Sequence, residues 1–187
     1  MKPHEHHNCQ RKWKNFLFFL HTQNNPINLS DSPFLLFQGS SGIMLSMESF
    51  KKKEDALLGL FKEAISPEQK YRVLIDLGHK LRVTQKESFT EEDVVEGCQS
   101  FMLLRSRRED VKLYFEIYSE ALISSGLAYL LVEFYSGESA EDILKTPPTF
   151  LEKLDLTSSL TPGRSNGLAA LYHKIRQLAA KQLISKN

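Results

Sequence analysis

Residues 101–135 read FMLLRSRREDVKLYFEIYSEALISSGLAYLLVEFY, and the rest of the chain is best interpreted outward from them. Two runs in this stretch, Phe101–Leu104 and Val111–Tyr118, favour β-strands because they are rich in aromatic and branched residues. In the second run apolar and polar residues alternate, which is the pattern of a strand with one buried face. The charged residues Arg105–Asp110 between the two runs predict the connection of a hairpin.

The residues that follow predict a long central helix. Ser119 is a suitable N-cap, and Glu120 is expected in the first turn, where the helix dipole favours a carboxylate. From Glu120 to Tyr135 the sequence is apolar nearly all round, so we place this helix in the core. Gly137 is expected to end it.

Further helices are predicted on both sides of this unit. Upstream, residues 50–65 have amphipathic spacing, and Ser66–Gln69 carries the start signal of a second helix that ends near Leu81. Downstream, three more helices are expected to begin at Ser139, Thr149 and Thr161. Strands and helices thus occur in separate runs, which predicts an α+β fold: a small antiparallel sheet of about three strands packed against helices as a two-layer sandwich.

The first quarter of the chain differs from the remainder. Residues 1–46 carry six charged side chains, whereas residues 47–187 carry 41. The apolar residues of the first segment lie in clusters such as Phe16–Leu20 and Phe34–Phe37, with no sustained helical or strand period. We therefore expect one domain over residues 47–187, and we interpret residues 1–46 as an unstructured extension or a misassigned start.

Composition excludes several classes of function. A net charge of +1 gives no basic surface for nucleic acid, and no apolar run reaches the roughly 18 residues of a membrane span. Zinc-finger spacing, a Walker loop and a dinucleotide-binding fingerprint do not occur in the sequence. The two cysteines, Cys9 and Cys98, cannot form a disulfide framework, so a reducing compartment, the cytoplasm, is expected.

Cys98 is the first candidate for chemistry. It lies just before the first predicted strand, with Gly97 allowing a tight turn and Gln99 and Ser100 placing hydrogen-bonding groups beside the thiol. A lone cysteine is most often a small buried hydrophobic residue, and the sequence leaves that alternative open.

Arg164 is the second candidate. It lies in the first turn of the last predicted helix, with Thr161 as N-cap and Gly167 permitting close packing. The helix dipole disfavours a cation at this position, so the arginine is expected to serve an anion or a thiolate elsewhere.

Other groupings rank lower. The cluster of His4, His6, His7 and Cys9 fits no compact tetrahedral metal site, so no metal is expected. Either His79 or His173 is a conceivable base for a protease-like pair with Cys98, since such partners meet only in space.

Three motifs in order carry a family resemblance: VEGCQS at 95–100, SEALISSG at 119–126 and LTPGRSNGL at 160–168. Over about residues 50–180 the chain resembles the SufE family, the sulfur-acceptor proteins of iron–sulfur cluster assembly. The resemblance implies a SufE/NifU-like α+β fold. It further implies that Cys98 accepts sulfane sulfur as a persulfide from a cysteine desulfurase of the SufS type and passes it to an iron–sulfur scaffold complex, stimulating the desulfurase.

Within that resemblance, Arg164 is expected to support the Cys98 thiolate, because a nearby cation favours the reactive form. Gly97, Gln99, Ser100 and Glu120 are expected to contact the partner. Such an accessory sulfur-transfer protein needs no cofactor, since pyridoxal phosphate belongs to the desulfurase, and the family is typically a monomer or weak homodimer. Three alternatives remain: sulfur relay to tRNA or cofactor thiolation, a free-standing cysteine enzyme, and an interaction module with a structural cysteine.

The sequence departs from the family pattern at three places. Ser125 stands where a lysine is usual before the helix glycine, and Glu120 replaces the commoner aspartate. Met102 and Leu103 stand where an aromatic residue is frequent in the strand after the cysteine. These departures leave the thiol chemistry intact and bear on how tightly the partner docks.

Overall fold

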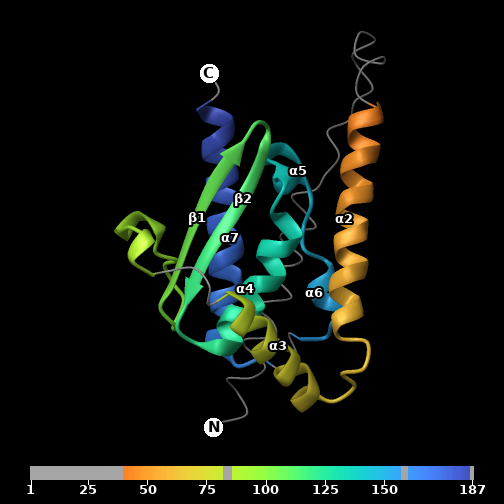
Figure 1. The fold of residues 1–187 in the computed structure, drawn as a ribbon, viewed down its shortest axis with the longest axis vertical. Helices are drawn as coiled ribbons and strands as arrows, with labels where there is room; N and C mark the ends of the chain where they lie inside the picture. The colour runs from red at the N-terminus through yellow and green to blue at the C-terminus, as the bar shows by residue number, and fades with distance from the viewer. Residues whose placement is uncertain (1–39, 82–85, 157–159, 186–187) are drawn as a thin grey trace.

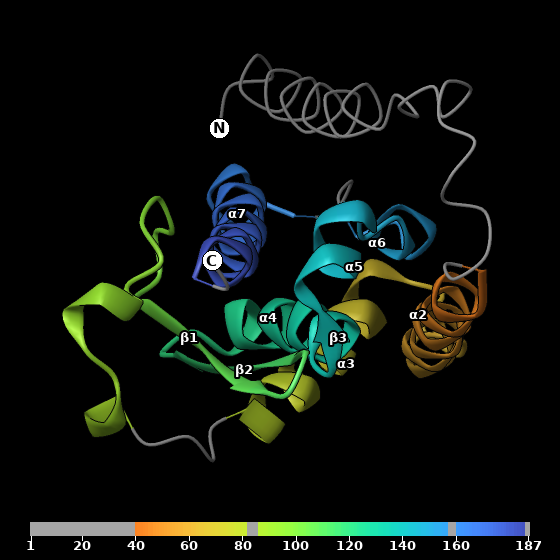
Figure 2. The ribbon, with the colours of Figure 1, turned by 90° about the horizontal axis from the view of Figure 1, so that it is seen from above.

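The computed structural model describes residues 40–81, 86–156 and 160–185. Within these ranges a three-stranded antiparallel sheet, in the order β1-β2-β3, is combined with helices that come before and after the hairpin in the chain (Figure 1). Seen from above, helices α4 (Leu122–Tyr135), α5 (Ala140–Lys145) and α7 (Pro162–Ile184) lie on one side of the sheet (Figure 2). The predicted α+β class is therefore confirmed.

The hairpin is longer than the sequence pattern predicted. Strand β1 is Met102–Glu109 and strand β2 is Lys112–Ser119, paired from Met102↔Ser119 to Glu109↔Lys112. The expected loop Arg105–Asp110 is thus mostly strand, and only Asp110 and Val111 form the turn. The apolar pattern revealed only the buried beginning of β1, because its second half is exposed and carries charged residues.

The third strand is short. Strand β3, Glu138–Ser139, pairs with β2 through Leu113↔Glu138 and Lys112↔Ser139. Gly137 precedes it with a φ of 81°, a left-handed conformation that glycine adopts without strain, and its N–H donates to the Leu113 carbonyl at 2.7 Å. Gly137 therefore ends the central helix as expected and returns the chain to the sheet.

The start of the central helix was predicted incorrectly. Ser119 belongs to β2, and helix α4 begins at Leu122 with Ala121 as its N-cap. Pairing with Met102 keeps Ser119 in the sheet, where its buried Oγ has no hydrogen-bond partner within the described ranges. Glu120 lies in the exposed bend between strand and helix, outside the first helical turn. The core position of α4 is confirmed, since ten of its residues are buried.

Helix α3 (Pro67–Leu81) crosses α4 at very close range. A Cβ atom added at Gly78 would lie 2.2 Å from the Leu122 carbonyl oxygen, and one added at Gly126 would lie 2.0 Å from the Leu74 carbonyl oxygen. Both distances are shorter than any real Cβ contact, so each glycine allows the two backbones to approach.

Helix α2 (Ser40–Leu60) begins earlier and ends earlier than the predicted helix over residues 50–65. The expected domain boundary between residues 46 and 47 falls inside it, and residues 1–39 lie outside the described part of the chain. Lys53 fixes α2 to the core by donating to the Ser136 carbonyl at 2.6 Å and to the carboxylate of the buried Glu138 at 2.5 Å. Ser49 donates to the same carboxylate at 2.6 Å.

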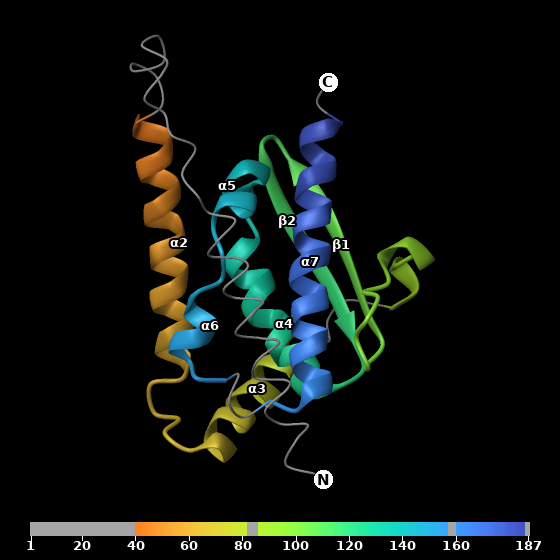
Figure 3. The same ribbon diagram turned by 180° about the vertical axis from the view of Figure 1, so that it is seen from behind.

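The C-terminal helices complete the core. Ser139 caps α5 by accepting the Asp142 N–H at 3.2 Å, and the short helix α6 spans Phe150–Lys153. Helix α7 contacts α4, α5 and β1, and runs along the length of the molecule (Figure 3). In the described portion of the chain, no helix is both long and apolar enough to cross a membrane.

Candidate functional site

The loop that carries Cys98 is anchored at both ends. A 3₁₀ turn, η3 (Glu91–Asp93), precedes it and is closed by the Thr90 N–H, which donates to the Asp93 carboxylate at 2.8 Å. Val94 then forms an antiparallel bridge with Leu103, and the Val95 N–H donates to the Met102 carbonyl at 2.9 Å. These contacts hold residues 96–101 as a closed loop at the start of β1.

Gly97 allows the loop to turn immediately before the cysteine. Its φ is 83°, which an L-residue adopts only with strain. The turn directs the half-buried free thiol of Cys98 toward α4 and α7. The sequence argument for Gly97 as the turn residue is therefore confirmed.

Cys98 lines a small recess, of about 10 Å³, between the loop and the helices. A volume of this size is that of roughly one water-sized probe. The walls are mainly apolar and come from β1, α4 and α7: Met102, Ser124, Leu127, Ala128, Arg164, Gly167, Leu168 and Leu171. The two sequence candidates, Cys98 and Arg164, thus border the same recess although 66 residues separate them.

The surroundings of the thiol favour its neutral form over the thiolate. Burial raises the pKa of Cys98, and the hydrogen bond from the Ser100 backbone N–H lowers it by a smaller amount. The sequence argument expected Arg164 to favour the thiolate, but desolvation dominates in this conformation. The guanidinium of Arg164 instead lies over the Tyr71 ring of α3, with its central carbon 5.7 Å from the ring centroid.

Two other predicted site residues, Ser100 and Gln99, belong to the loop itself and contact the helices. Ser100 Oγ lies 3.1 Å from Ser124 Oγ of α4, which ties the loop to the central helix. The exposed Gln99 lies against the first turn of α7, where a Cβ added at Gly163 would meet the Gln99 side chain.

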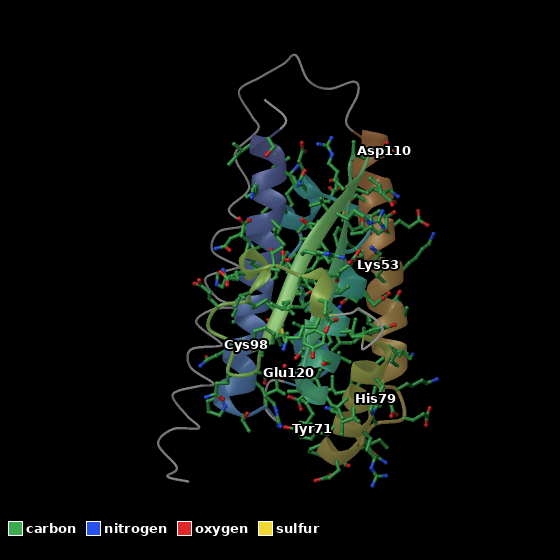
Figure 4. The ribbon with its side chains drawn as sticks, turned by 60° about the vertical axis from the view of Figure 1, so that its left-hand side comes forward. Lys53, Tyr71, His79, Cys98, Asp110 and Glu120 are labelled. Atoms are coloured by element: carbon green, nitrogen blue, oxygen red, sulfur yellow. The ribbon has the colours of Figure 1, made fainter. Side chains whose placement is uncertain are left out.

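Glu120 lies at the same end of the molecule as Cys98, opposite the hairpin turn at Asp110 (Figure 4). It forms an ion pair of 3.0 Å with Lys86 of the 3₁₀ turn η2 (Lys86–Ser88). The Lys86 ammonium also lies 4.6 Å from the centroid of the Phe101 ring, directly beside the cysteine loop. Glu120 therefore contacts the segment that flanks the loop.

Neither histidine proposed as a base lines the recess. His79 is exposed on α3 and lies apart from Cys98 in Figure 4, and His173 is exposed on α7. The described residues also include no group of three or more metal-ligating side chains. The cluster of His4, His6, His7 and Cys9 lies outside the described residues.

Sequence reasoning missed the far wall of the recess. Ser124, Leu127 and Ala128 belong to a helix that is apolar all round, so no pattern distinguishes the residues facing the cysteine from those facing the sheet. The sequence offered one signal for this wall, the pair Ser124–Ser125 inside an apolar run. Buried hydroxyls need hydrogen-bond partners, so the pair indicated that a polar segment packs against the helix there. Lys86 and its contacts with the strand end were also missed.

In the part of the chain that the structure describes, fold and site define an α+β domain that presents a free cysteine on an anchored loop beside an apolar recess. Residues 55–179 match the model of the SufE family, described as an Fe–S metabolism associated domain. The chain belongs to this family.

Individual proteins resemble the chain over much of its length. It is 33% identical over 155 residues to SufE-like protein 1, chloroplastic/mitochondrial, of Arabidopsis thaliana, covering 82% of this chain and 40% of that protein. An uncharacterized SufE-like protein of Synechocystis is 29% identical over 119 residues, covering 64% of this chain and 75% of that protein. The chain thus spans less than half the length of the Arabidopsis relative.

A solved structure has the same fold. The solution structure of a hypothetical protein from Thermus thermophilus superposes with a TM-score of 0.57 at 28% sequence identity. The match covers 71% of this chain and 96% of that one. At 28% identity this structure supports the fold, and the description of the family model links the domain to Fe–S metabolism.

Proposed function

We propose that the protein is a sulfur carrier in which Cys98 accepts sulfane sulfur from a cysteine desulfurase as a persulfide and passes it on for iron–sulfur cluster assembly. The observation that carries this proposal is the position of the thiol: a free cysteine, on a loop anchored at both ends, faces a small apolar recess. Membership of the SufE family supports the same role.

The transfer is a thiol–disulfide exchange. The Cys98 thiolate attacks the terminal sulfur of the donor's persulfide, a new S–S bond forms at Cys98, and the donor's S–S bond breaks. The donor cysteine leaves as a thiolate, and the proton from Cys98 passes to solvent or to a base of the partner. The exchange balances without an external oxidant or reductant.

The resting conformation partly shields the thiol and lowers its reactivity. Burial raises the pKa of Cys98, so the thiolate is scarce until the loop moves. We propose that docking of the desulfurase draws the loop outward, exposing Cys98 while Gly97 and the strand start remain as its hinges. Arg164 is proposed to support the thiolate while the sulfur is still at the recess, since Cys98 and Arg164 border the same recess.

Gly97, Gln99 and Ser100 are proposed contacts of the partner because they lie on the loop beside Cys98, and Glu120 is proposed because it lies at the same end of the molecule. In this account the protein also stimulates the desulfurase, by removing the sulfur that blocks its next turnover. The sulfur then passes to an iron–sulfur scaffold complex, and the carrier acts as a monomer or weak homodimer. A cytoplasmic location stays a prediction, which cell fractionation checks.

The experiment that tests the proposal measures desulfurase turnover with and without the protein. Alanine formation from cysteine should rise on addition of the wild-type protein and should not rise with Cys98→Ser. Cys9→Ser is the matched control and should stimulate as the wild type does. Turnover without desulfurase would favour a free-standing enzyme, and equal stimulation by Cys98→Ser would contradict the proposal.

A further inference from the structure

Helix α7 approaches the thiol at a residue that has no side chain. A Cβ atom added at the buried Gly167 would lie 2.7 Å from Cys98 Sγ, closer than real Cβ contacts allow. The same atom would lie 3.7 Å from Cys98 Cβ and 3.9 Å from Cys98 Cα, which are ordinary van der Waals distances. A side chain at this position would therefore displace the sulfur atom and leave the loop backbone in place.

The backbone itself does not require glycine here. The glycines with positive φ in the described ranges are Gly97 and Gly137, and Gly167 lies within the regular helix α7. Alanine is the better helix former at such a position. The reason for glycine is thus the contact with the sulfur atom.

We propose that Gly167 is a positioning residue for Cys98: the missing side chain lets the sulfur atom lie inward against α7. A methyl group there turns the thiol out of the recess, toward the solvent side of the loop. Since desolvation in the recess raises the pKa of the thiol, an outward thiol ionises at lower pH and reacts faster. The inference rests on the proposed function only in treating Cys98 as the sulfur acceptor.

The test is the pH profile of alkylation by iodoacetamide, with all variants carrying Cys9→Ser so that one thiol remains. The Cys98 thiolate attacks the carbon of the reagent, an S–C bond forms and iodide leaves. Gly167→Ala should react several-fold faster at pH 7 and show its midpoint at lower pH than the Gly167 protein. An unchanged rate and midpoint would overturn the inference. No desulfurase is present, so this outcome is distinguishable from failure of the proposed function.

Gly59→Ala serves as the matched control. It lies on α2, where nothing comes within 4 Å of the added Cβ. This variant should leave the alkylation profile unchanged. If it shifts the profile as far as Gly167→Ala does, the effect is a general one of replacing a helical glycine and the inference is wrong.

A second measurement holds even if Gly167→Ala folds poorly. In a Cys98→Ala background the nearest remaining contact of the new methyl is at 3.7 Å, so Gly167→Ala should raise the melting temperature there. In the background that retains Cys98, the same substitution should raise it less or lower it. An equal change in both backgrounds, including failure to fold in both, would contradict the contact with the sulfur.

Discussion

Substituting Gly126 by alanine tests whether the crossing of α3 and α4 sets the geometry of the core. The added Cβ would lie 2.0 Å from the carbonyl oxygen, 2.7 Å from the carbonyl carbon and 2.9 Å from the Cα of Leu74. All three are backbone atoms, so α3 must move away. Overpacking lowers the free energy of unfolding by about 1–3 kcal/mol where side chains can adjust, and we take about 3 kcal/mol because backbone must move here. The better helix propensity of alanine offsets about 1 kcal/mol of this loss. The expected net loss is about 2 kcal/mol.

Thermal unfolding followed by circular dichroism measures this loss. About 2 kcal/mol corresponds to a fall of roughly 6 °C in melting temperature for a domain of this size. Gly59→Ala is the control, because its methyl meets nothing within 4 Å and should leave stability unchanged or slightly higher. If Gly126→Ala melts at or above the wild-type temperature, the close helix crossing does not constrain the fold and the reasoning is refuted.

Three further predictions concern charge, pH and the N-terminal segment. Arg164→Ala should slow sulfur acceptance from a desulfurase by up to about tenfold, which corresponds to about 1.4 kcal/mol in activation free energy. A wild-type rate would show that the arginine does not support the thiolate and serves only in its contact with the Tyr71 ring. Burial raises the pKa of Tyr135 well above its ordinary value, so its stabilising neutral form is fully present below about pH 10 and is lost as pH rises toward the folded-state pKa. At pH 7, Tyr135→Phe should lower the free energy of unfolding by about 1–2 kcal/mol, because the Thr146 carbonyl loses the hydroxyl that donates to it at 2.8 Å. As the pH is raised above about 10, urea titrations should show a smaller further loss of stability in Tyr135→Phe than in the wild type. Deleting residues 1–46 should leave the melting temperature nearly unchanged, since Ser49 and Lys53, which bond α2 to the core, are retained; a large fall would show that the segment packs on the domain.

The fold was predictable where burial and secondary structure coincide in the sequence. Alternating residues of β2 and the apolar run of α4 indicate a strand and a core helix directly. The hairpin was shortened in the prediction because the second half of β1 is exposed and charged, so hydrophobic periodicity does not mark it. Ser119 was assigned to the helix because capping preference is a local signal, whereas its pairing with Met102 is set by the sheet register.

The sequence pointed to the two candidate residues Cys98 and Arg164, but not to the far wall of the recess or to its electrostatics. The glycine before Cys98 and the arginine at the start of the last helix marked two separated elements that border one recess. A local sequence pattern cannot report desolvation, which depends on the packing of α4 and α7 around the thiol. The raised pKa of Cys98 and the position of Arg164 over Tyr71 therefore emerged only from the fold.

Peptide mass spectrometry after incubation with a cysteine desulfurase, pyridoxal phosphate and cysteine tests the central claim most directly. The account predicts an added mass of one sulfur atom on the peptide that contains Cys98, removed by a thiol reductant. It predicts no adduct in Cys98→Ser, whose circular dichroism spectrum and melting should stay close to wild type because serine is nearly isosteric with cysteine. Sulfur loading of the Cys98→Ser protein to the wild-type level would contradict the assignment of Cys98 as the acceptor.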